Sequence, residues 1–239
     1  MKKMFCMMLT IASLVGFTSC SGDDKEDVAL NLPSSKSMKV GDVYDMQYKS
    51  DWRSNNTFVA SVDNNGVVTA NRVGTANIYS NAHRCQVTVS ANVTLYNEPI
   101  TEWGISQSYL ISKRGTPYSS TSSAVAYDLN SDITPFEMYS FENNKLTAAI
   151  VLVSTTYTEY MLDHLSERFK PVYVDSEDLT ALFINAESLD EAKTTIVTTL
   201  YNTKYWAVMY MLNDGSSKAR STQADKIKEL KLELDKMKL

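Results

Sequence analysis

Short alternating runs of apolar and polar residues, separated by turn-forming residues, constrain the fold more than any other feature of this sequence. Apolar residues occupy every second position of Phe58–Val62, and Val67–Ala70 follows after a turn that contains Asn65-Gly66. Both turn residues tolerate the positive φ angles of a type I′ turn, so the segment predicts a β-hairpin. Arg84–Val89 alternates in the same way, with one face buried and the other solvated. Residues 28–93 therefore predict a small β-sandwich.

A series of short motifs runs in order through the same stretch. The motifs are Val40–Asp42, Trp52–Asn55, Val59–Asp63, Gly66–Ala70, Gly74–Ile78 and Val87–Val89. Together they resemble the bacterial immunoglobulin-like domain of group 2, or Big-type domain. The resemblance implies an all-β Ig-like sandwich over residues 28–95, of a kind that serves as an adhesin module or as a spacer and has no catalytic centre.

The Trp52 motif also raises the question of a sugar platform. Trp52, Arg53 and Asn55 combine an aromatic ring with polar groups, which is the combination that a glycan site needs. In this motif, however, we expect Trp52 to lie in the core. We likewise expect Cys85 to be a small buried side chain, and His83 is a lone imidazole that gives no sign of a metal site.

A second domain follows a short crossing at residues 96–104. Residues 105–215 predict an α+β domain with a largely antiparallel sheet and two helices on one face. The predicted helices are Tyr157–Phe169 and Leu189–Tyr201, each preceded by residues with capping-box spacing. The predicted strands are Ser123–Asn130, Phe136–Glu142, Lys145–Ser154, Pro171–Val174, Thr180–Ala186 and Tyr205–Leu212, with Asn143-Asn144 as a hairpin turn.

Two of these strands, Ala148–Val153 and Trp206–Leu212, are apolar on both faces, although a sheet with helices on one side needs only one apolar face. The second face can pack on the Ig-like domain, on a second copy or on a partner; a fully covered sheet centre is the alternative. The aromatic residues that we expect to face a ligand on such a surface are Tyr139, Tyr173, Tyr205, Trp206 and Tyr210.

Residues 216–239 form a highly charged tail. Ile227, Leu230, Leu234 and Met237 are spaced as in heptads. Two heptads are marginal for a coiled coil, because helix nucleation is costly and short helices fray. We therefore expect a solvated helical tail and not a dimerisation device.

The first residues predict export and a lipid anchor. Residues 1–19 have a basic start and an apolar run of 14 residues, Met4–Phe17, which is too short to span a bilayer. Phe17–Cys20 resembles the lipobox of bacterial lipoproteins, which implies that Cys20 is acylated and becomes the mature N-terminus. The acidic tether at residues 20–27 resembles the surface-export signal of Bacteroidetes lipoproteins. We expect an outer-membrane lipoprotein exposed on the cell surface, with an ordinary cleaved signal peptide as the alternative.

Charge and motif content argue against several functions. Removal of residues 1–19 deletes two lysines and no acid, and changes the formal charge from −5 to −7. An acidic body does not suit nucleic-acid binding, which needs basic charge. The sequence has no G-x-S-x-G, H-E-x-x-H or phosphate-binding glycine loop, and we expect no catalytic residues, metal or cofactor. His164 predicts a surface ion cluster with Glu167 and Arg168.

The acidic residues are the remaining candidates for chemistry. Glu98 and Glu102 flank the crossing, and Asp175, Glu177 and Asp178 share a turn. A glycosidase needs only two carboxylates, and carboxylate oxygens also bind calcium. We expect a non-catalytic, lipid-anchored surface protein that binds a glycan or a protein. The alternatives are a surface hydrolase that uses acids of the second domain and a structural envelope component. The ligand and the oligomeric state stay open.

Overall fold

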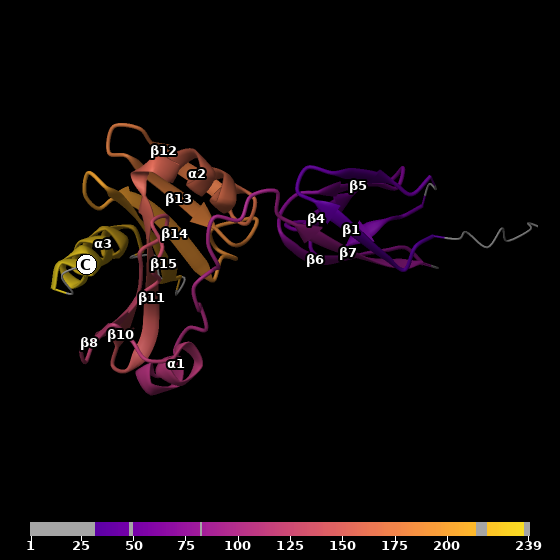
Figure 1. Ribbon diagram of the computed structural model, residues 1–239. Coiled ribbons are helices and arrows are strands. Elements are labelled where there is room, and N and C mark those ends of the chain that lie inside the picture. The colour runs from indigo at the N-terminus through magenta and orange to yellow at the C-terminus, as the bar shows by residue number, and fades with distance from the viewer. Residues whose placement is uncertain (1–31, 48–49, 82, 214–218, 237–239) are drawn as a thin grey trace, which may run out of the picture. The chain divides into compact units, whose positions relative to one another are not determined.

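A computed structural model describes residues 32–47, 50–81, 83–213 and 219–236 (Figure 1). The described chain is mostly β, with open sheets and three α-helices. Every strand pairing is antiparallel except one, in which the first strand runs parallel to its neighbour. The leader, Cys20 and the whole acidic tether lie outside the described residues, so lipid attachment at Cys20 stays a prediction.

Residues 35–90 form two sheets, called the N-terminal sheet pair below. The four-stranded sheet has the order β1 (Ser35–Lys39), β7 (Arg84–Ser90), β6 (Gly74–Tyr79), β3 (Arg53–Ser54), and the three-stranded sheet has the order β2 (Val43–Asp45), β5 (Val67–Ala70), β4 (Ala60–Val62). Both sheets contribute to one apolar core. Trp52 and Cys85 lie in this core, which confirms both predictions, and burial raises the pKa of the Cys85 thiol.

The turn between β4 and β5 confirms the predicted hairpin but not its turn type. Gly66 has a positive φ of 86°, whereas Asn65 is not among the described residues with positive φ. The Asp63 carboxylate accepts hydrogen bonds from the backbone N–H groups of Asn65 and Val67, both at 2.9 Å. This carboxylate, and not two left-handed residues, holds the turn.

The rest of the chain contains an eight-stranded antiparallel sheet. Its order is β12 (Lys170–Asp175), β13 (Thr180–Ile184), β14 (Thr194–Leu200), β15 (Tyr205–Leu212), β11 (Lys145–Ser154), β10 (Phe136–Glu142), β9 (Ala124–Asp128), β8 (Ser119–Ser120). Six of these strands were predicted, with ends that differ by up to two residues. The hairpin turn at Asn143 and Asn144 is confirmed too, since their φ angles are 50° and 59°.

The predicted second helix, Leu189–Tyr201, is wrong. Residues 194–200 are strand β14, which pairs with β13 on one side and β15 on the other. Thr194–Thr199 is a run of six β-branched residues, whose restricted χ1 angles favour a strand. This preference outweighs the helical spacing of Leu189, Ala192 and Ile196.

The helices also differ in part from the prediction. Helix α2 (Thr158–Ser166) follows the 3-10 turn η1 (Thr155–Tyr157), so the first predicted helix is confirmed in position. Its predicted capping box is wrong, because the N-cap is Tyr157 and no side chain caps it. Helix α1 (Gln107–Arg114) was not predicted; the Ser106 hydroxyl caps it by accepting from the Tyr109 N–H.

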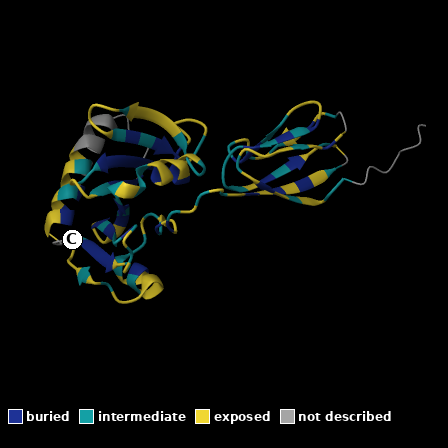
Figure 2. Ribbon diagram, turned by 45° about the horizontal axis from the view of Figure 1, so that its top comes forward, coloured by how far each residue is buried: buried dark blue, intermediate teal, exposed yellow. Residues whose placement is uncertain are grey.

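The two faces of the eight-stranded sheet lie in two separate cores, and the alternation of β11 shows it. Ala149, Val151 and Val153 pack with Leu110 of α1 and with Met161 and Leu165 of α2. Ala148, Ile150 and Leu152 belong to the opposite core, with Leu230 and Leu234 of α3 (Ala219–Lys236). Figure 2 shows the buried residues concentrated along these strands.

Two further predictions are therefore wrong. The helices lie on both faces of the sheet and not on one, because α3 packs opposite α1 and α2. Residues 219–236 are a packed helix and not a solvated tail, since Leu230 and Leu234 are buried. The helix supplies the cover that a sheet with two apolar faces requires.

Candidate ligand-binding site

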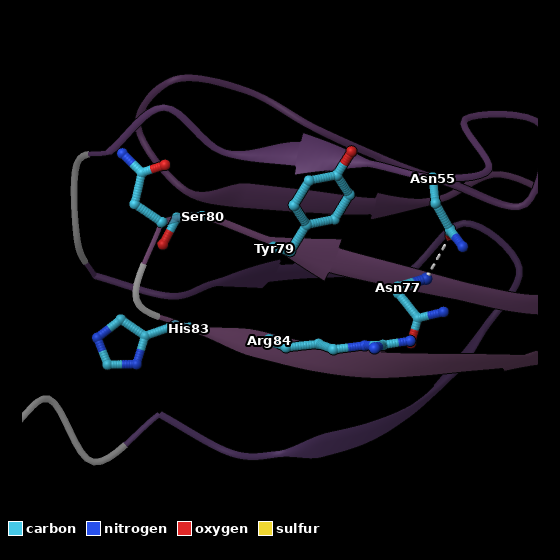
Figure 3. Close-up of a pocket in the computed structure, with 7 residues that line it drawn as sticks. Asn55, Asn77, Tyr79, Ser80, His83 and Arg84 are labelled. Carbon is cyan, nitrogen blue, oxygen red and sulfur yellow. Dashed lines mark hydrogen bonds between the residues drawn. The ribbon is translucent and has the colours of Figure 1, made fainter.

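An open pocket of about 580 Å³ lies on the four-stranded sheet, at the end where β6 and β7 meet (Figure 3). Its lining residues are polar or aromatic: Asn55, Asn77, Tyr79, Ser80, Asn81, His83 and Arg84. They come from β6, β7, the connection between these strands, and the residue that follows β3.

Strand alternation creates this polar wall. Along β7, buried Cys85, Val87 and Val89 alternate with exposed residues, which are Arg84, Gln86, Thr88 and Ser90. Because successive side chains point to opposite faces, the sequence that fills the core also makes the outer face polar. The neighbouring strand β6 adds one aromatic residue to this polar face. This residue is Tyr79, which has 38% of its surface exposed.

Hydrogen bonds fix the amide side of the pocket. The Asn77 N–H donates to Asn55 Oδ1 at 2.7 Å, and the Asn55 N–H donates to the Asn77 carbonyl at 3.1 Å. Arg84 Nε donates to Asn77 Oδ1 at 3.2 Å, which orients the guanidinium along the sheet. Figure 3 shows Tyr79 beside this amide pair. The wall thus offers ordered polar groups next to a ring face.

The five aromatic residues predicted to face a ligand do not share a surface. Tyr139 and Tyr210 are buried in the core between the eight-stranded sheet and helices α1 and α2, so the prediction is wrong for them. Trp206 packs against the same core and Tyr205 against the opposite one. Tyr173 alone is well exposed, on the edge strand β12. Alternation along β15 sends neighbouring aromatic residues to opposite faces.

A buried polar network replaces the predicted surface cluster at His164. This imidazole has no exposed surface. Its Nδ1 accepts from the Leu95 N–H at 3.2 Å, so the ring proton is on Nε2, which donates to Glu98 Oε1 at 2.7 Å. Arg168 Nε lies 3.4 Å from the same oxygen. The network attaches the connecting segment to α2.

Two tyrosines extend this network into the core. The Tyr96 and Tyr210 hydroxyls lie 2.8 Å apart, and the Tyr96 ring packs on the His164 ring with centroids 4.2 Å apart. Burial, reinforced by the Glu98 charge, raises the pKa of both phenols. Both hydroxyls are therefore neutral at physiological pH and act as hydrogen-bonding groups in the protein interior.

The acidic candidates are engaged in local structure. Glu102 forms an ion pair with Lys113 of α1 at 2.6 Å. The Asp175 carboxylate accepts from the N–H groups of Asp178 and Glu177 and from the Tyr173 hydroxyl, and these bonds lower the pKa of Asp175. Within the described ranges, no three His, Cys, Asp or Glu residues are grouped so as to hold a metal ion.

One buried carboxylate was missed by the sequence analysis. Glu137 of β10 is almost fully buried and forms an ion pair with Arg114 of α1, while the Tyr139 hydroxyl donates to its other oxygen. The Ile100 N–H in turn donates to the Tyr139 hydroxyl at 3.0 Å. A lone acid inside a strand, Phe136-Glu137-Met138, was the available signal, but its partner lies on the helix that was not predicted.

The pocket residues were also missed, except for Asn55. Arg53 and Asn55 were candidates for a sugar platform with Trp52. Trp52 is buried, as predicted, whereas Asn55 lines the pocket and Arg53 lies opposite Tyr79 in the strand register. The aromatic residue of this surface is therefore Tyr79. His83, predicted to be unrelated to a metal site, lines the same pocket.

Comparison of the chain with protein-family models gives no match, and comparison with curated proteins gives none either. In the described part of the chain, none of the helices combines the length and the apolar character needed to cross a bilayer.

Proposed function

We propose that this protein is a non-catalytic, lipid-anchored surface protein that binds a glycan at the Tyr79 pocket. The observation that carries the proposal is an exposed tyrosine ring beside hydrogen-bonded amide groups in an open pocket. Apolar faces of sugar rings stack on aromatic rings, and sugar hydroxyls need polar partners at defined positions. The pocket offers both on a rigid sheet.

The proposal includes the domain organisation. Residues 28–95 form a Big-type Ig-like sandwich, 96–104 a crossing and 105–215 an α+β domain, and helix α3 (Ala219–Lys236) belongs to that domain's core. In support, the core of the N-terminal sheet pair and the two cores of the eight-stranded sheet are made of separate sets of residues. The ligand contact moves from the second domain, where the sequence analysis expected it, to the first.

The anchor is the second part of the proposal. Cys20 carries the lipid, and the body faces the outside of the outer membrane. Two or more acyl chains hold a protein to a bilayer, because each buried methylene contributes about 0.8 kcal/mol. Palmitate labelling of cells that express the protein or its Cys20→Ala variant tests this; equal labelling of both would exclude the anchor.

Glycan binding is tested with residues 21–239, which contain the whole compact unit 32–239. We expect this fragment to bind a defined subset of glycans on an array, and Tyr79→Ala to lose at least about tenfold in affinity, as removal of a stacking anchor does. Tyr160→Ala, which removes an exposed tyrosine from α2, is the control and should bind normally. Absence of glycan binding, or equal binding by Tyr79→Ala, would overturn the proposal.

A protein ligand is the second candidate, favoured by the edge strand β12. Val172, Tyr173 and Val174 expose 48%, 54% and 69% of their surfaces on this edge. An exposed apolar edge is a template for strand addition by another chain. A pull-down from surface proteins with the 21–239 fragment and with its Val172→Lys/Val174→Lys variant separates this candidate from glycan binding. Loss of a captured protein with the variant supports strand addition, and capture by both excludes it.

A further inference from the structure

The outer face of the four-stranded sheet has an unusual charge for this protein. The chain has 28 acidic and 23 basic residues, yet the four strands of this sheet contain Lys36, Lys39, Arg53 and Arg84 and no acid. Lys36 points to the Tyr44 ring, with its Nζ 4.2 Å from the centroid. The other three are exposed, so the outward charges of these strands are all positive.

The strand register places two of these cations on either side of Tyr79. Arg53 of β3 and Arg84 of β7 are each paired directly with Tyr79 of β6. Directly opposite residues of antiparallel strands point to the same face. Neighbouring strands are about 4.8 Å apart, so the two arginine positions are separated by roughly 10 Å, about the length of a disaccharide.

The arginines are available for a ligand. Among the residues that the structure describes, neither Arg53 nor Arg84 forms an ion pair with a carboxylate; Arg84 is held only through its Nε bond to Asn77. Asp51, the nearest acid along the chain, lies two residues before Arg53 and accepts a hydrogen bond from the Ser50 hydroxyl. No described carboxylate therefore neutralises either guanidinium group, and the register places the two arginines on the strands that flank Tyr79.

We propose that this face binds an acidic polysaccharide that carries carboxylate groups, with the Arg53–Tyr79–Arg84 row as its contact. The planar guanidinium fork matches a carboxylate with two parallel hydrogen bonds. A uronate chain laid across the strands would place one sugar over Tyr79 and carboxylates of its neighbours at the arginines. The inference rests on the proposed glycan binding and names the class of glycan.

Charge complementarity also decides between polyanions. Nucleic-acid affinity depends on many phosphate contacts. Beyond this one face the protein is acidic and would repel the phosphates of a nucleic acid. A short uronate segment needs only the two arginines and the ring. The fixed amides of Asn55 and Asn77 add partners for sugar hydroxyls.

The test compares charged and neutral forms of one polymer. Residues 21–239 are titrated with polygalacturonate, alginate and hyaluronate, and with fully methyl-esterified polygalacturonate, which lacks the charge. We expect binding to at least one uronate polymer and none to the ester. Arg53→Gln/Arg84→Gln should weaken uronate binding about tenfold or more. Lys145→Gln/Lys204→Gln, which removes two exposed cations elsewhere, should leave it unchanged.

Salt dependence is the second readout. Raising NaCl from about 0.05 to about 0.5 M shortens the Debye length and should weaken binding by the wild type more than by the double arginine variant. Binding of the ester as tight as that of the acid would overturn the inference. So would full binding by the arginine variant, or tighter binding of dextran sulfate or single-stranded DNA than of any uronate.

The outcomes separate this inference from the proposed function. Binding of neutral glycans that depends on Tyr79 but not on Arg53 and Arg84 would refute the acidic ligand and leave glycan binding intact. Absence of binding to every glycan, charged or neutral, would refute both.

Discussion

The four-stranded sheet and the eight-stranded sheet use the same strand geometry for opposite purposes. In the four-stranded sheet, β7 alternates buried and exposed residues, so one face makes the core and the other meets water. In the eight-stranded sheet, β11 is buried at seven of its ten positions, because helices cover both faces.

The difference shows where a ligand site can form. A sheet that is apolar on both faces uses all its side chains for stability, and its tyrosines become core residues, as Tyr139 and Tyr210 do. A sheet with one solvated face keeps a rigid, polar surface at little cost to the core. The predictions below test this division between a stabilising sheet and a binding sheet.

The largest effect is expected where α3 covers the second face of the eight-stranded sheet. Leu234→Ala should lower the free energy of unfolding by about 3 kcal/mol, because it leaves a cavity against a buried strand. Leu232→Ala, on the exposed side of the same helix, should change it by less than about 0.5 kcal/mol. Urea denaturation measures both; equal effects would mean that α3 does not pack on the sheet.

A smaller loss is expected from the ion pair under α1. Arg114→Gln should destabilise by about 2 kcal/mol, because it leaves the Glu137 carboxylate buried without its counter-charge. Lys113→Gln, the adjacent residue with an exposed partner, should cost less than about 1 kcal/mol. Urea denaturation measures both variants. Unchanged stability of Arg114→Gln would contradict an ion pair between Arg114 and a buried, charged Glu137.

Two glycines test packing in the N-terminal sheet pair. A Cβ on Gly74 (φ 146°) would lie 2.7 Å from Val59 Cγ2, whereas one on Gly41 (φ 88°) would meet open space. Both Ala variants pay for the positive φ, so Gly74→Ala should be about 1 kcal/mol less stable than Gly41→Ala. Thermal unfolding of the two variants gives the comparison; identical midpoints would argue against close contact at Val59.

The smallest effect on stability is expected on the binding face. Tyr79→Ala should change the free energy of unfolding by no more than about 0.5 kcal/mol, because the ring is exposed. A larger loss in denaturation would show that Tyr79 is a structural residue, and any loss of glycan binding by this variant would then reflect misfolding.

Much of the fold could be read from local pattern. Apolar runs bounded by turn residues located β10, β11 and β15, and Asn143-Asn144 located the hairpin between two of them. The pattern failed at β14, where Leu189, Ala192 and Ile196 have helical spacing but Thr194–Thr199 are β-branched. It also missed α1, an eight-residue helix with one buried side chain, whose amphipathic signal is too short to stand out.

The candidate site depended on register, which the sequence does not display. Arg53 and Asn55 could be identified as polar neighbours of an aromatic residue, but the ring that they adjoin, Tyr79, lies on another strand. Pairing of β3 with β6 brings Arg53 and Asn55 to Tyr79 and Asn77 over separations of 22 residues and more. The packing of α3 on the eight-stranded sheet could not be predicted either. Heptad spacing shows that a helix has an apolar side, but it does not show which part of the protein that side contacts.

The position of α3 has a consequence for biosynthesis. The core that contains Leu152 is completed by Leu230, so 78 residues of further chain must leave the ribosome before that face of the sheet is covered. Until then this apolar face of strands β11 and β15 lacks the cover that α3 supplies. For the export that we propose, this delay would be favourable, because a chain that has not yet folded can pass through a secretion channel.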